Sequence, residues 1–434
     1  MNPSISSESA TLITPAGAAV APKSVRRGLC FAGPGCLVAV GYMDPGNWAT
    51  SIAGGSRFGY SLLAVILVSN LIAMLFQAAA VRLGIASGRD LAQACRDHFG
   101  PGASLVLWGM AEFAVVACNI AEVLGMAIGL KLLFGIPMLL GVFITAADVM
   151  LVLSLQRYGF RLIEAFVAAL VALIAMCFVA QVAWLHPPAG AVLSGFVPHP
   201  DIVTDPRMLY VAVGIVGATV MPHNLYLHSA VVQNRPYQRN AGGKEEAIFY
   251  STLDSSAALG LALFVNAGIL IVAAAAFHRP DLPPVTALGD AYRLMSPVLG
   301  IGMASAVFGV ALLASGLSAS ITGTLAGQIV MEGFLTIRLS PGLRSMLTRA
   351  LAIVPAGLVT AFYGERGVDA LLVFSQVILS LQLPFAAVPL VWFTTRKAHL
   401  GSFAFGTVMG ATLWTALAVV TLLDIWLTWH LLAG

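Results

Sequence analysis

The sequence predicts an all-α protein that crosses a membrane eleven times, as two five-span halves of opposite orientation plus one further span. The first observation is composition: 59% of the residues are hydrophobic, only 9% are charged, and the mean hydropathy is +0.92. A soluble domain carries about 25% charged residues. The second is a series of apolar runs near the ~20 residues that span a bilayer. The third is a pair of matching helix-breaking motifs.

The predicted spans follow the hydropathy of the chain. They are residues 29–56, 59–84, 102–134, 137–154, 160–184, 208–232, 248–277, 297–336, 346–363, 368–394 and 403–430. The third and eighth are long, so we expect them to tilt or to extend beyond the bilayer. The connections at 185–207, 233–247 and 278–296 are expected to hold short structure at most.

The chain is expected to form three parts. Residues 1–27 are rich in Ser, Ala and Pro and end in basic residues, which favours a disordered cytoplasmic tail over a signal peptide. Residues 28–394 form the ten-span core, and 395–434 hold the eleventh span and the C-terminus. Most of the 22 lysines and arginines fall in connections on the side of the N-terminus, so the positive-inside rule predicts a cytoplasmic N-terminus and an external C-terminus in an inner (plasma) membrane.

Composition also limits the partners. The net charge is +3 and there is no basic block, so nucleic acid is not an expected partner. The five cysteines are scattered without a CxxC pair, which favours reduced packing residues over a disulfide set or a metal cluster. We expect the lipid bilayer as surroundings, no obligatory protein partner and no cofactor.

Two predicted spans are interrupted by similar motifs. The first contains Asp44-Pro45-Gly46-Asn47 and the sixth contains Met221-Pro222-His223-Asn224. A proline inside a helix removes a backbone hydrogen bond and collides with the preceding turn. Within a membrane such damage is tolerated only where the freed backbone is buried in protein or lines a cavity. Paired broken helices in corresponding positions are the sequence pattern of a transporter binding site.

The spacing of the breaks predicts an inverted repeat. Five spans separate the first broken span from the second, so the two halves insert with opposite orientation, and the eleventh span lies outside the repeat. The side chains at the breaks indicate what is bound there. Asp44 offers a carboxylate, Asn47 an amide oxygen and Met221 a thioether.

At this point the motifs resemble a known family. Residues 41–47 (GYMDPGN) and 221–229 (MPHNLYLHS) are similar to the two hallmark motifs of the NRAMP family of proton-coupled manganese and iron transporters. Residues 316–334 resemble that family's transport signature, and residues 374–385 resemble its tenth span. The resemblance covers nearly all of the chain beyond residue 28.

The resemblance implies a leucine-transporter-like fold with the metal bound at mid-membrane between broken spans one and six. The family's ligands correspond here to Asp44, Asn47 and Met221. Backbone carbonyls at Gly41 and Ala218 complete the implied site in one conformation or another. Gln376 corresponds to a residue that joins the site in the occluded state.

The chemistry of these side chains agrees with the implied cargo. Mg²⁺ and Ca²⁺ prefer oxygen ligands alone, whereas a thioether suits softer ions. A site with one thioether should therefore favour Mn²⁺, Fe²⁺, Co²⁺ and Cd²⁺ and should handicap the abundant hard cations. We expect an importer that works by alternating access and couples metal entry to proton entry.

Intramembrane ionisable residues are the candidates for the proton route. Asp44 can bind either the metal or a proton. His223 is a candidate because an unperturbed histidine titrates near neutral pH. Glu112 and Glu122 lie ten residues apart on span three and could line one side of a bundle. The resemblance implies a route from Asp44 and His223 through Glu122 toward Arg349.

The chain departs from the family's pattern at this route. Asn119 stands where relatives often carry an aspartate, and Thr348 stands where they often carry a second arginine. The two differences remove one pair of opposite charges and point to altered proton coupling. Leu317 replaces a glutamine common in the signature, away from the metal site.

Structural roles compete with some of these assignments. Asp44, Asn47 and Asn224 could act as helix caps, and Met221 could be core packing. We favour a ligand role for Asn47, a structural role for Asn224 and a buried, satisfied role for His228. Asn70 and Asn266 match polar family positions in mid-span, where we expect them to hydrogen-bond the broken segments. Asp148 and Glu164, nearer span ends, are interpreted as structural or snorkelling.

Other functions are weighed against metal symport. A transporter of the same fold could carry a small organic substrate such as an amino acid, but Asp44 would repel that substrate's carboxylate. A metal uniporter with weak proton coupling is a second alternative. A membrane metalloenzyme predicts a motif such as HExxH, which the sequence lacks. A channel predicts a repeated filter motif, and none is present.

Overall fold

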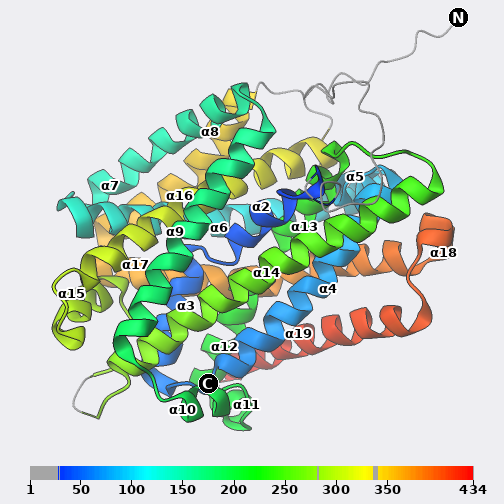
Figure 1. Ribbon diagram of the computed structural model, residues 1–434. Coiled ribbons are helices and arrows are strands. Elements are labelled where there is room, and N and C mark those ends of the chain that lie inside the picture. Colours follow the sequence, from blue (N-terminus) through cyan, green and yellow to red (C-terminus); the bar gives the residue numbers. More distant parts are fainter. Residues whose placement is uncertain (1–27, 29, 281–282, 336–340, 434) are drawn as a thin grey trace, which may run out of the picture.

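The computed structural model describes residues 28, 30–280, 283–335 and 341–433. The predicted N-terminal tail, residues 1–27, therefore lies outside the described residues. Throughout the described part the secondary structure is helical, without strands (Figure 1). Within these residues nine helices are long and apolar enough to cross a membrane. They are Leu63–Ser87, Pro101–Phe134, Phe160–Leu185, Pro206–Asn234, Ala241–Phe277, Ala304–Phe334, Met346–Gly364, Gly367–Thr395 and Thr407–His430.

The remaining two predicted spans are built from shorter helices. The first consists of α2 (Pro34–Gly41) and α3 (Pro45–Phe58). The fourth consists of α7 (Met138–Ile144), a 3-10 turn η2 (Thr145–Ala147) and α8 (Asp148–Arg157). The architecture is the predicted all-α membrane fold of eleven spans, with the broken first and sixth spans in its interior.

The other elements complete the chain in order. They are α4 (Leu63–Ser87), α5 (Leu91–His98), α6 (Pro101–Phe134), α9 (Phe160–Leu185), α10 (Ala189–Ser194), α11 (Asp201–Thr204), α12 (Pro206–Thr219), α13 (Pro222–Val231), η3 (Val232–Asn234), α14 (Ala241–Phe277), α15 (Leu288–Leu299), α16 (Ala304–Phe334), α17 (Pro341–Thr395), α18 (Lys397–Leu400), η4 (Gly401–Phe403) and α19 (Thr407–Ala433). The short α5 and α18 lie at one end of the bundle, and α10 and α11 lie at the other end (Figure 1).

Both predicted helix breaks are present, and proline explains each restart. The first helix of span one ends at Gly41, and the next begins with Pro45. In span six, α12 ends at Thr219 and α13 begins with Pro222. Proline is well suited to the first position of a helix because its missing N–H would have no intrahelical partner there.

The seventh and eighth spans begin away from their predicted positions, whereas the ninth and tenth agree with the prediction to within a residue. The eighth span begins at Ala304 rather than 297, because Gly300 adopts a left-handed conformation (φ 67°) and ends a separate helix, α15. The seventh begins at residue 241, where the Asn240 side chain accepts a hydrogen bond from the Gly243 N–H (2.8 Å) and caps α14. The ninth and tenth spans follow one another in α17 across a kink at Gly364 (φ 62°).

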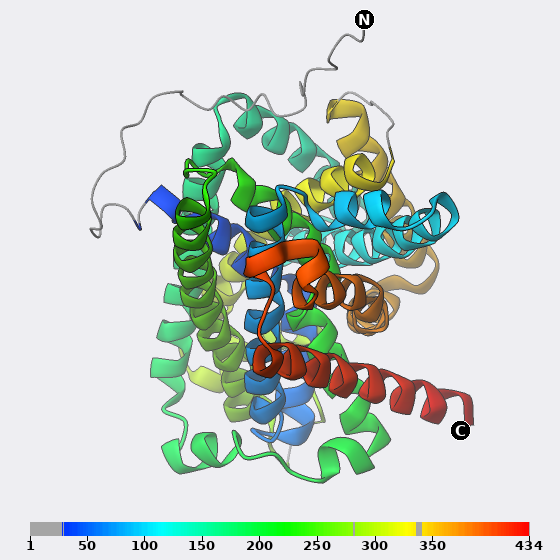
Figure 2. The same ribbon diagram turned by 90° about the vertical axis from the view of Figure 1, so that its right-hand side faces the viewer.

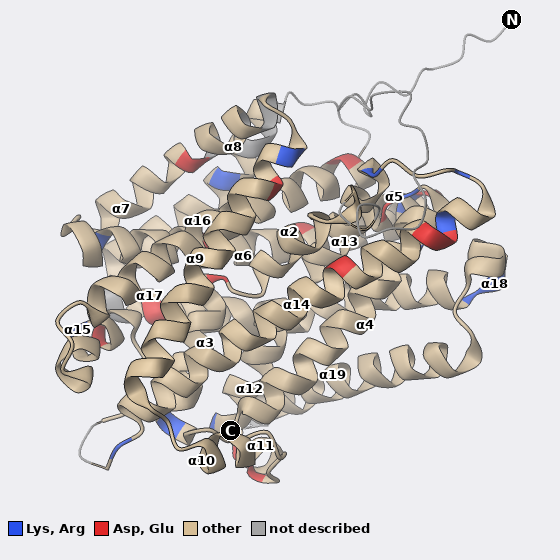
Figure 3. Cartoon of the chain, in the orientation of Figure 1, with Lys and Arg blue, Asp and Glu red and all other residues tan. Residues whose placement is uncertain are grey.

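The broken helices sit at the centre of the packing. Helix α6 packs along α16 and α17, α14 packs on α2, α3 and α4, and α12 packs on α17. Trp48 of α3 is fully buried, with its ring edge-on to Phe178 (4.8 Å) and Phe308 (5.1 Å). Helix α19 lies along the outside of the bundle (Figure 2). Charged residues lie mainly near helix ends and connections, with few along the middle of the bundle (Figure 3).

The close approach of α12 to α17 gives a test of this packing. A methyl group added at Gly217 would collide with the Gln376 carbonyl, and helix backbone cannot yield as a flexible side chain does. We expect Gly217→Ala to destabilise the protein by about 1–3 kcal/mol, the usual cost of overpacking. Thermal unfolding of the purified protein in detergent measures the effect.

The matched control is Gly260→Ala in α14. No atom lies within 4 Å of the position its methyl group would occupy. Because alanine favours helix over glycine by about 1 kcal/mol, this variant should be neutral or slightly more stable. Equal unfolding temperatures for the two variants would contradict the close packing of α12 on α17.

Candidate metal site at the paired helix breaks

Asp44 caps helix α3 with one oxygen of its buried carboxylate, while the other oxygen makes no hydrogen bond. Its Oδ1 accepts hydrogen bonds from the Asn47 N–H (2.8 Å) and from the Asn47 side-chain NH₂ (2.7 Å). Its Oδ2 is buried and has no hydrogen-bond partner. Capping therefore accounts for one oxygen of Asp44 and leaves the other unexplained. Buried polar atoms without a partner are rare, and each calls for a reason such as a ligand.

Oxygen atoms from both broken spans converge beside Asn47. Its NH₂ group donates to the Gly41 carbonyl (3.3 Å), the Ala218 carbonyl (2.9 Å) and Asp44 Oδ1. Gly41 belongs to α2, and Ala218 belongs to α12, which are far apart in the sequence. Three oxygen acceptors gathered around one neutral NH₂ donor form an environment that also suits a cation.

Met221 brings a sulfur atom to the same place. It is fully buried at the start of α13, and its Sδ lies 3.7 Å from the Asn224 side-chain nitrogen. A methyl group added at Gly41 would lie 3.0 Å from this sulfur, so only glycine allows the close approach of α2 to α13. Asn224 also donates to the Val38 carbonyl (3.4 Å), which ties the two broken spans together.

Gln376 of α17 lies against the first turn of α3. A methyl group added at Gly46 would collide with its side-chain amide. The amide nitrogen donates to the Ser375 hydroxyl (3.0 Å), whereas Oε1 is buried without a partner. The structure thus brings all six predicted ligand positions together. They are Gly41, Asp44, Asn47, Ala218, Met221 and Gln376.

Of the two mid-span asparagines, only Asn266 supports a broken segment. Its NH₂ group donates to the freed Tyr42 carbonyl (2.6 Å) and to Asn47 Oδ1 (3.3 Å). The prediction for Asn70 was wrong, because its NH₂ group donates to the Leu259 carbonyl of α14 (3.2 Å). Position within a hydrophobic run could not reveal which neighbouring helix each side chain faces.

His228 lies in a hydrogen-bonded chain behind the first break. Its Nδ1 is 2.8 Å from Gln77 Oε1, and the Gln77 amide donates to the Tyr42 hydroxyl (2.9 Å). The predicted buried, satisfied role thus fits this ring nitrogen, although Nε2 has no partner. His223 differs, because both of its ring nitrogens are buried without hydrogen-bond partners.

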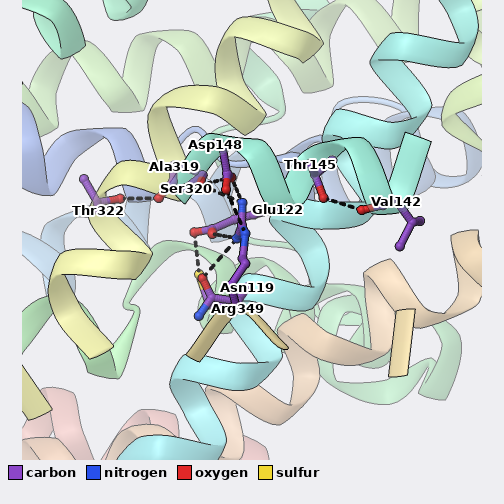
Figure 4. A network of polar contacts seen from close by, with 10 residues as sticks. Asn119, Glu122, Val142, Thr145, Asp148, Ala319, Ser320, Thr322 and Arg349 are labelled. Atoms are coloured by element: carbon purple, nitrogen blue, oxygen red, sulfur yellow. Dashed lines mark hydrogen bonds and ion pairs between the residues drawn. The ribbon is translucent and has the colours of Figure 1, made fainter. Parts of the chain in front are cut away.

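A second polar centre surrounds Arg349, which is 2% exposed (Figure 4). Its guanidinium donates to Glu122 Oε2 (3.3 Å) and to Asn119 Oδ1 (3.4 Å) on α6. It also forms an ion pair with Asp148 of α8 and donates to the Ser320 hydroxyl of α16 (2.6 Å). Three predicted proton-route residues, Asn119, Glu122 and Arg349, are therefore in direct contact.

Glu112 is not linked to this centre by hydrogen bonds. Both of its carboxylate oxygens are buried and have no partner. It shares helix α6 with Glu122, as predicted, but stands apart from the Arg349 cluster.

The sequence leaves Asp148 as structural or snorkelling, and the structure supports the structural alternative. Asp148 is 8% exposed and paired with Arg349, so it does not reach toward the membrane surface. Glu164 is likewise buried, in an ion pair with Arg235. Charge pairing across distant segments leaves no local sequence pattern. The signal that could have indicated Asp148 was the need of a buried arginine for a full counter-charge.

Asp424 is a further buried carboxylate that the sequence did not single out. It lies on α19, accepts a hydrogen bond from the Ser380 hydroxyl (2.7 Å), and has a buried Oδ2 without a partner. Ser380 is one helical turn beyond Gln376 on α17. The eleventh span thus contacts the tenth close to the site.

The donor set is unlike that of a resident structural metal. Among the described residues no group of three or more His, Cys, Asp or Glu side chains could hold a metal ion. The site instead offers one carboxylate, two amides, two carbonyls and a thioether. These groups are oxygen and sulfur donors that can coordinate a divalent transition metal, and they carry only one formal negative charge.

Paired broken helices around a buried polar site, inside a bundle of apolar spans, define the chain as a multi-pass membrane transporter. The model of the family described as "Natural resistance-associated macrophage protein-like" (Nramp) matches residues 35–430. The chain belongs to this family, which is a family of transporters and not of enzymes.

Individual relatives agree with this assignment. A protein of Bradyrhizobium diazoefficiens, named divalent metal cation transporter MntH, is 56% identical over 409 residues, covering 94% of this chain and 91% of the relative. A crystal structure of the Eremococcus coleocola manganese transporter superposes with a TM-score of 0.87 at 40% identity, covering 94% of this chain and 87% of that one. The nucleobase-cation-symport-1 transporter Mhp1 shares the fold, with a TM-score of 0.61 at 17% identity.

The different partners of the two asparagines give a test of the site. We expect Asn266→Ala to weaken Mn²⁺ binding about 10- to 100-fold, because residues that hold ligands in place contribute on this scale. Isothermal titration calorimetry on the purified protein measures the affinity. Asn70→Ala is the matched control, since Asn70 is equally buried but bonds α14, and it should leave the affinity unchanged. An equal loss in both variants would show that neither supports the site specifically.

Proposed function

We propose that the protein imports divalent transition metals, Mn²⁺ foremost and also Fe²⁺, Co²⁺ and Cd²⁺, together with protons across the inner (plasma) membrane. The observation that carries the proposal is the unpartnered, buried Oδ2 of Asp44 beside the Gly41 and Ala218 carbonyls and the Met221 sulfur. The names of the relatives from Bradyrhizobium diazoefficiens and Eremococcus coleocola support the cargo class.

Binding begins with the side chains at the two breaks. Asp44 supplies the one formal negative charge, and the Asn47 amide turns its oxygen toward the metal, since amide orientation follows the hydrogen-bond network. The carbonyls of Gly41 and Ala218, which now accept hydrogen bonds from the Asn47 NH₂ group, then coordinate the metal instead. Met221 adds the thioether that hard cations use poorly.

Transport follows from the position of the breaks between two halves of the bundle. Rocking of the segments on either side exposes the site first outside and then inside, which is alternating access around a fixed site. Gln376 lies against the first turn of α3 and closes on the metal in the occluded state. The membrane potential assists entry by ~2.3 kcal/mol per unit charge at 100 mV.

The proton starts from the same carboxylate that binds the metal, Asp44, but follows a different route through the protein. Asp44 holds a proton in the absence of metal and releases it when metal binds. His223 and Glu122 then pass protons toward Arg349 and the cytoplasm, and Glu112 provides a further carboxylate on α6. The N-terminus lies in the cytoplasm and the C-terminus outside, as the distribution of Lys and Arg predicts.

The test is Mn²⁺ uptake into proteoliposomes that contain a pH-sensitive dye. The wild-type protein should take up Mn²⁺ saturably and acidify the interior. Asp44→Ala should reduce uptake at least 100-fold, on the order of 3 kcal/mol, because the charged ligand is lost. Asp290→Ala, at an exposed carboxylate in α15, is the matched control and should transport normally.

Met221→Ala tests the role of the thioether in the same assay. It should keep much of the Mn²⁺ uptake but admit Ca²⁺ or Mg²⁺, since the handicap against hard cations is removed. Unchanged rejection of Ca²⁺ would contradict selectivity by Met221. Uptake of an amino acid without uptake of Mn²⁺ by the wild type would instead support an organic substrate, and Mn²⁺ uptake without acidification would support a uniporter.

A further inference from the structure

The polar cluster around Arg349 contains two carboxylates, those of Asp148 and Glu122, but only one guanidinium to balance their charge. Asp148, the first residue of α8, forms an ion pair with Arg349, and its Oδ1 accepts a second hydrogen bond from Arg349 Nε (3.1 Å). The Ser320 hydroxyl also donates to Asp148. Glu122 contacts the other side of the same guanidinium, through Nη1 (3.3 Å). Two acids from different helices therefore share one base.

In the described part of the chain no further base neighbours the cluster, and one other acid, Asp44, interacts electrostatically with Glu122. Among the described residues, the other ionisable side chain in contact is Cys118, whose Sγ lies 3.4 Å from Glu122 Oε1. Helix α9, which packs on α8, carries Arg161 and Glu164. These contact each other, Arg235 and the carbonyls of residues 30 and 32 instead. Asn119 and Ser320, which complete the shell of Arg349, are uncharged.

This composition makes the cluster a site for one proton. With both acids ionised it carries a net charge of −1, and it is neutral when one acid holds a proton. An uncompensated buried charge is strongly unfavourable, so the two acids and the base titrate as a unit. If Glu122 were the only acid, the pair would be neutral without a proton, and protonation would leave Arg349 uncompensated.

We propose that Asp148 is the counter-ion that neutralises Arg349 and thereby allows Glu122 to take up and release the transported proton. Asp148 is thus a positioning residue for proton transfer, on a span that forms no part of the helix breaks. The inference rests on the proposed proton coupling and assigns the charge balance that such coupling needs.

Asn119 offers a way to move the counter-charge to another helix. Its Oδ1 accepts a hydrogen bond from Arg349 Nη1 at 3.4 Å. An aspartate at this position would reach the same guanidinium from α6 instead of α8. The double variant Asn119→Asp/Asp148→Asn keeps the charge of the cluster and changes only where the second acid is attached.

The experiment measures the ratio of protons to Mn²⁺ entering proteoliposomes, for the wild type, Asp148→Asn, the double variant and the exposed control Asp290→Asn. Asp148→Asn should lower the ratio about tenfold and flatten the dependence of Mn²⁺ uptake on external pH. The double variant should restore both the ratio and the pH dependence, and Asp290→Asn should match the wild type.

The outcomes separate this inference from the proposed function. Mn²⁺ uptake without protons in the wild type would remove proton coupling itself. A coupled wild type with an equally coupled Asp148→Asn would overturn the role of Asp148 alone. If Asp148→Asn does not fold, the double variant decides. Thermal unfolding at the wild-type temperature first shows that the double variant is folded. Uptake of Mn²⁺ together with protons by this variant then supports the role of the counter-charge, and uptake of Mn²⁺ without protons overturns that role.

Discussion

A backbone carbonyl released by a helix break cannot turn to water inside a membrane, and leaving it unpaired costs several kcal/mol. This requirement shapes the centre of the molecule. The Tyr42 carbonyl is satisfied by Asn266, the Gly41 and Ala218 carbonyls by Asn47, and the Val38 carbonyl by Asn224. Donors from several spans must meet at the two breaks, so the breaks fix how those spans pack. The asparagines that stabilise the broken backbone are the same groups that surround the candidate metal site.

The buried charges, like the freed carbonyls, need partners within the protein, and leaving a charge unpaired costs more free energy than leaving a carbonyl unpaired. Arg349 is compensated by acids from α6 and α8, and Arg235 is paired with Glu164. Asp44 differs, because its spare oxygen faces no cation of the protein. Removing one partner of a buried pair typically costs 3–5 kcal/mol, so each paired charge fastens two spans to each other. Under the proposed function, the counter-charge of this unpaired carboxylate is the transported metal.

The sequence was sufficient for the features that depend on local chemistry. Apolar length predicted the spans, and proline within an apolar run predicted both breaks, because a proline imposes its geometry on its own helix. Boundaries set by turns were harder, as the late start of the eighth span after Gly300 shows. Contacts between helices were hardest. The site residues on the two motifs lie together as predicted, whereas the partners of Asn70 and Asp148 depend on which faces meet after folding.

The two polar centres contact adjacent turns of α6, and this contiguity bears on how metal and proton could influence each other. Met221 belongs to one cluster of buried side chains with Ala114, Ala117 and Cys118 of that helix. The Cys118 thiol in turn donates to Glu122 of the Arg349 cluster (3.4 Å). Coupling between sites requires a packed element whose two arrangements both sites can bias. A movement of α13 relative to α6 would change the sulfur contact at the metal site and the surroundings of Glu122 together. The third span, which is continuous and carries no break, is therefore the helix that contacts both centres.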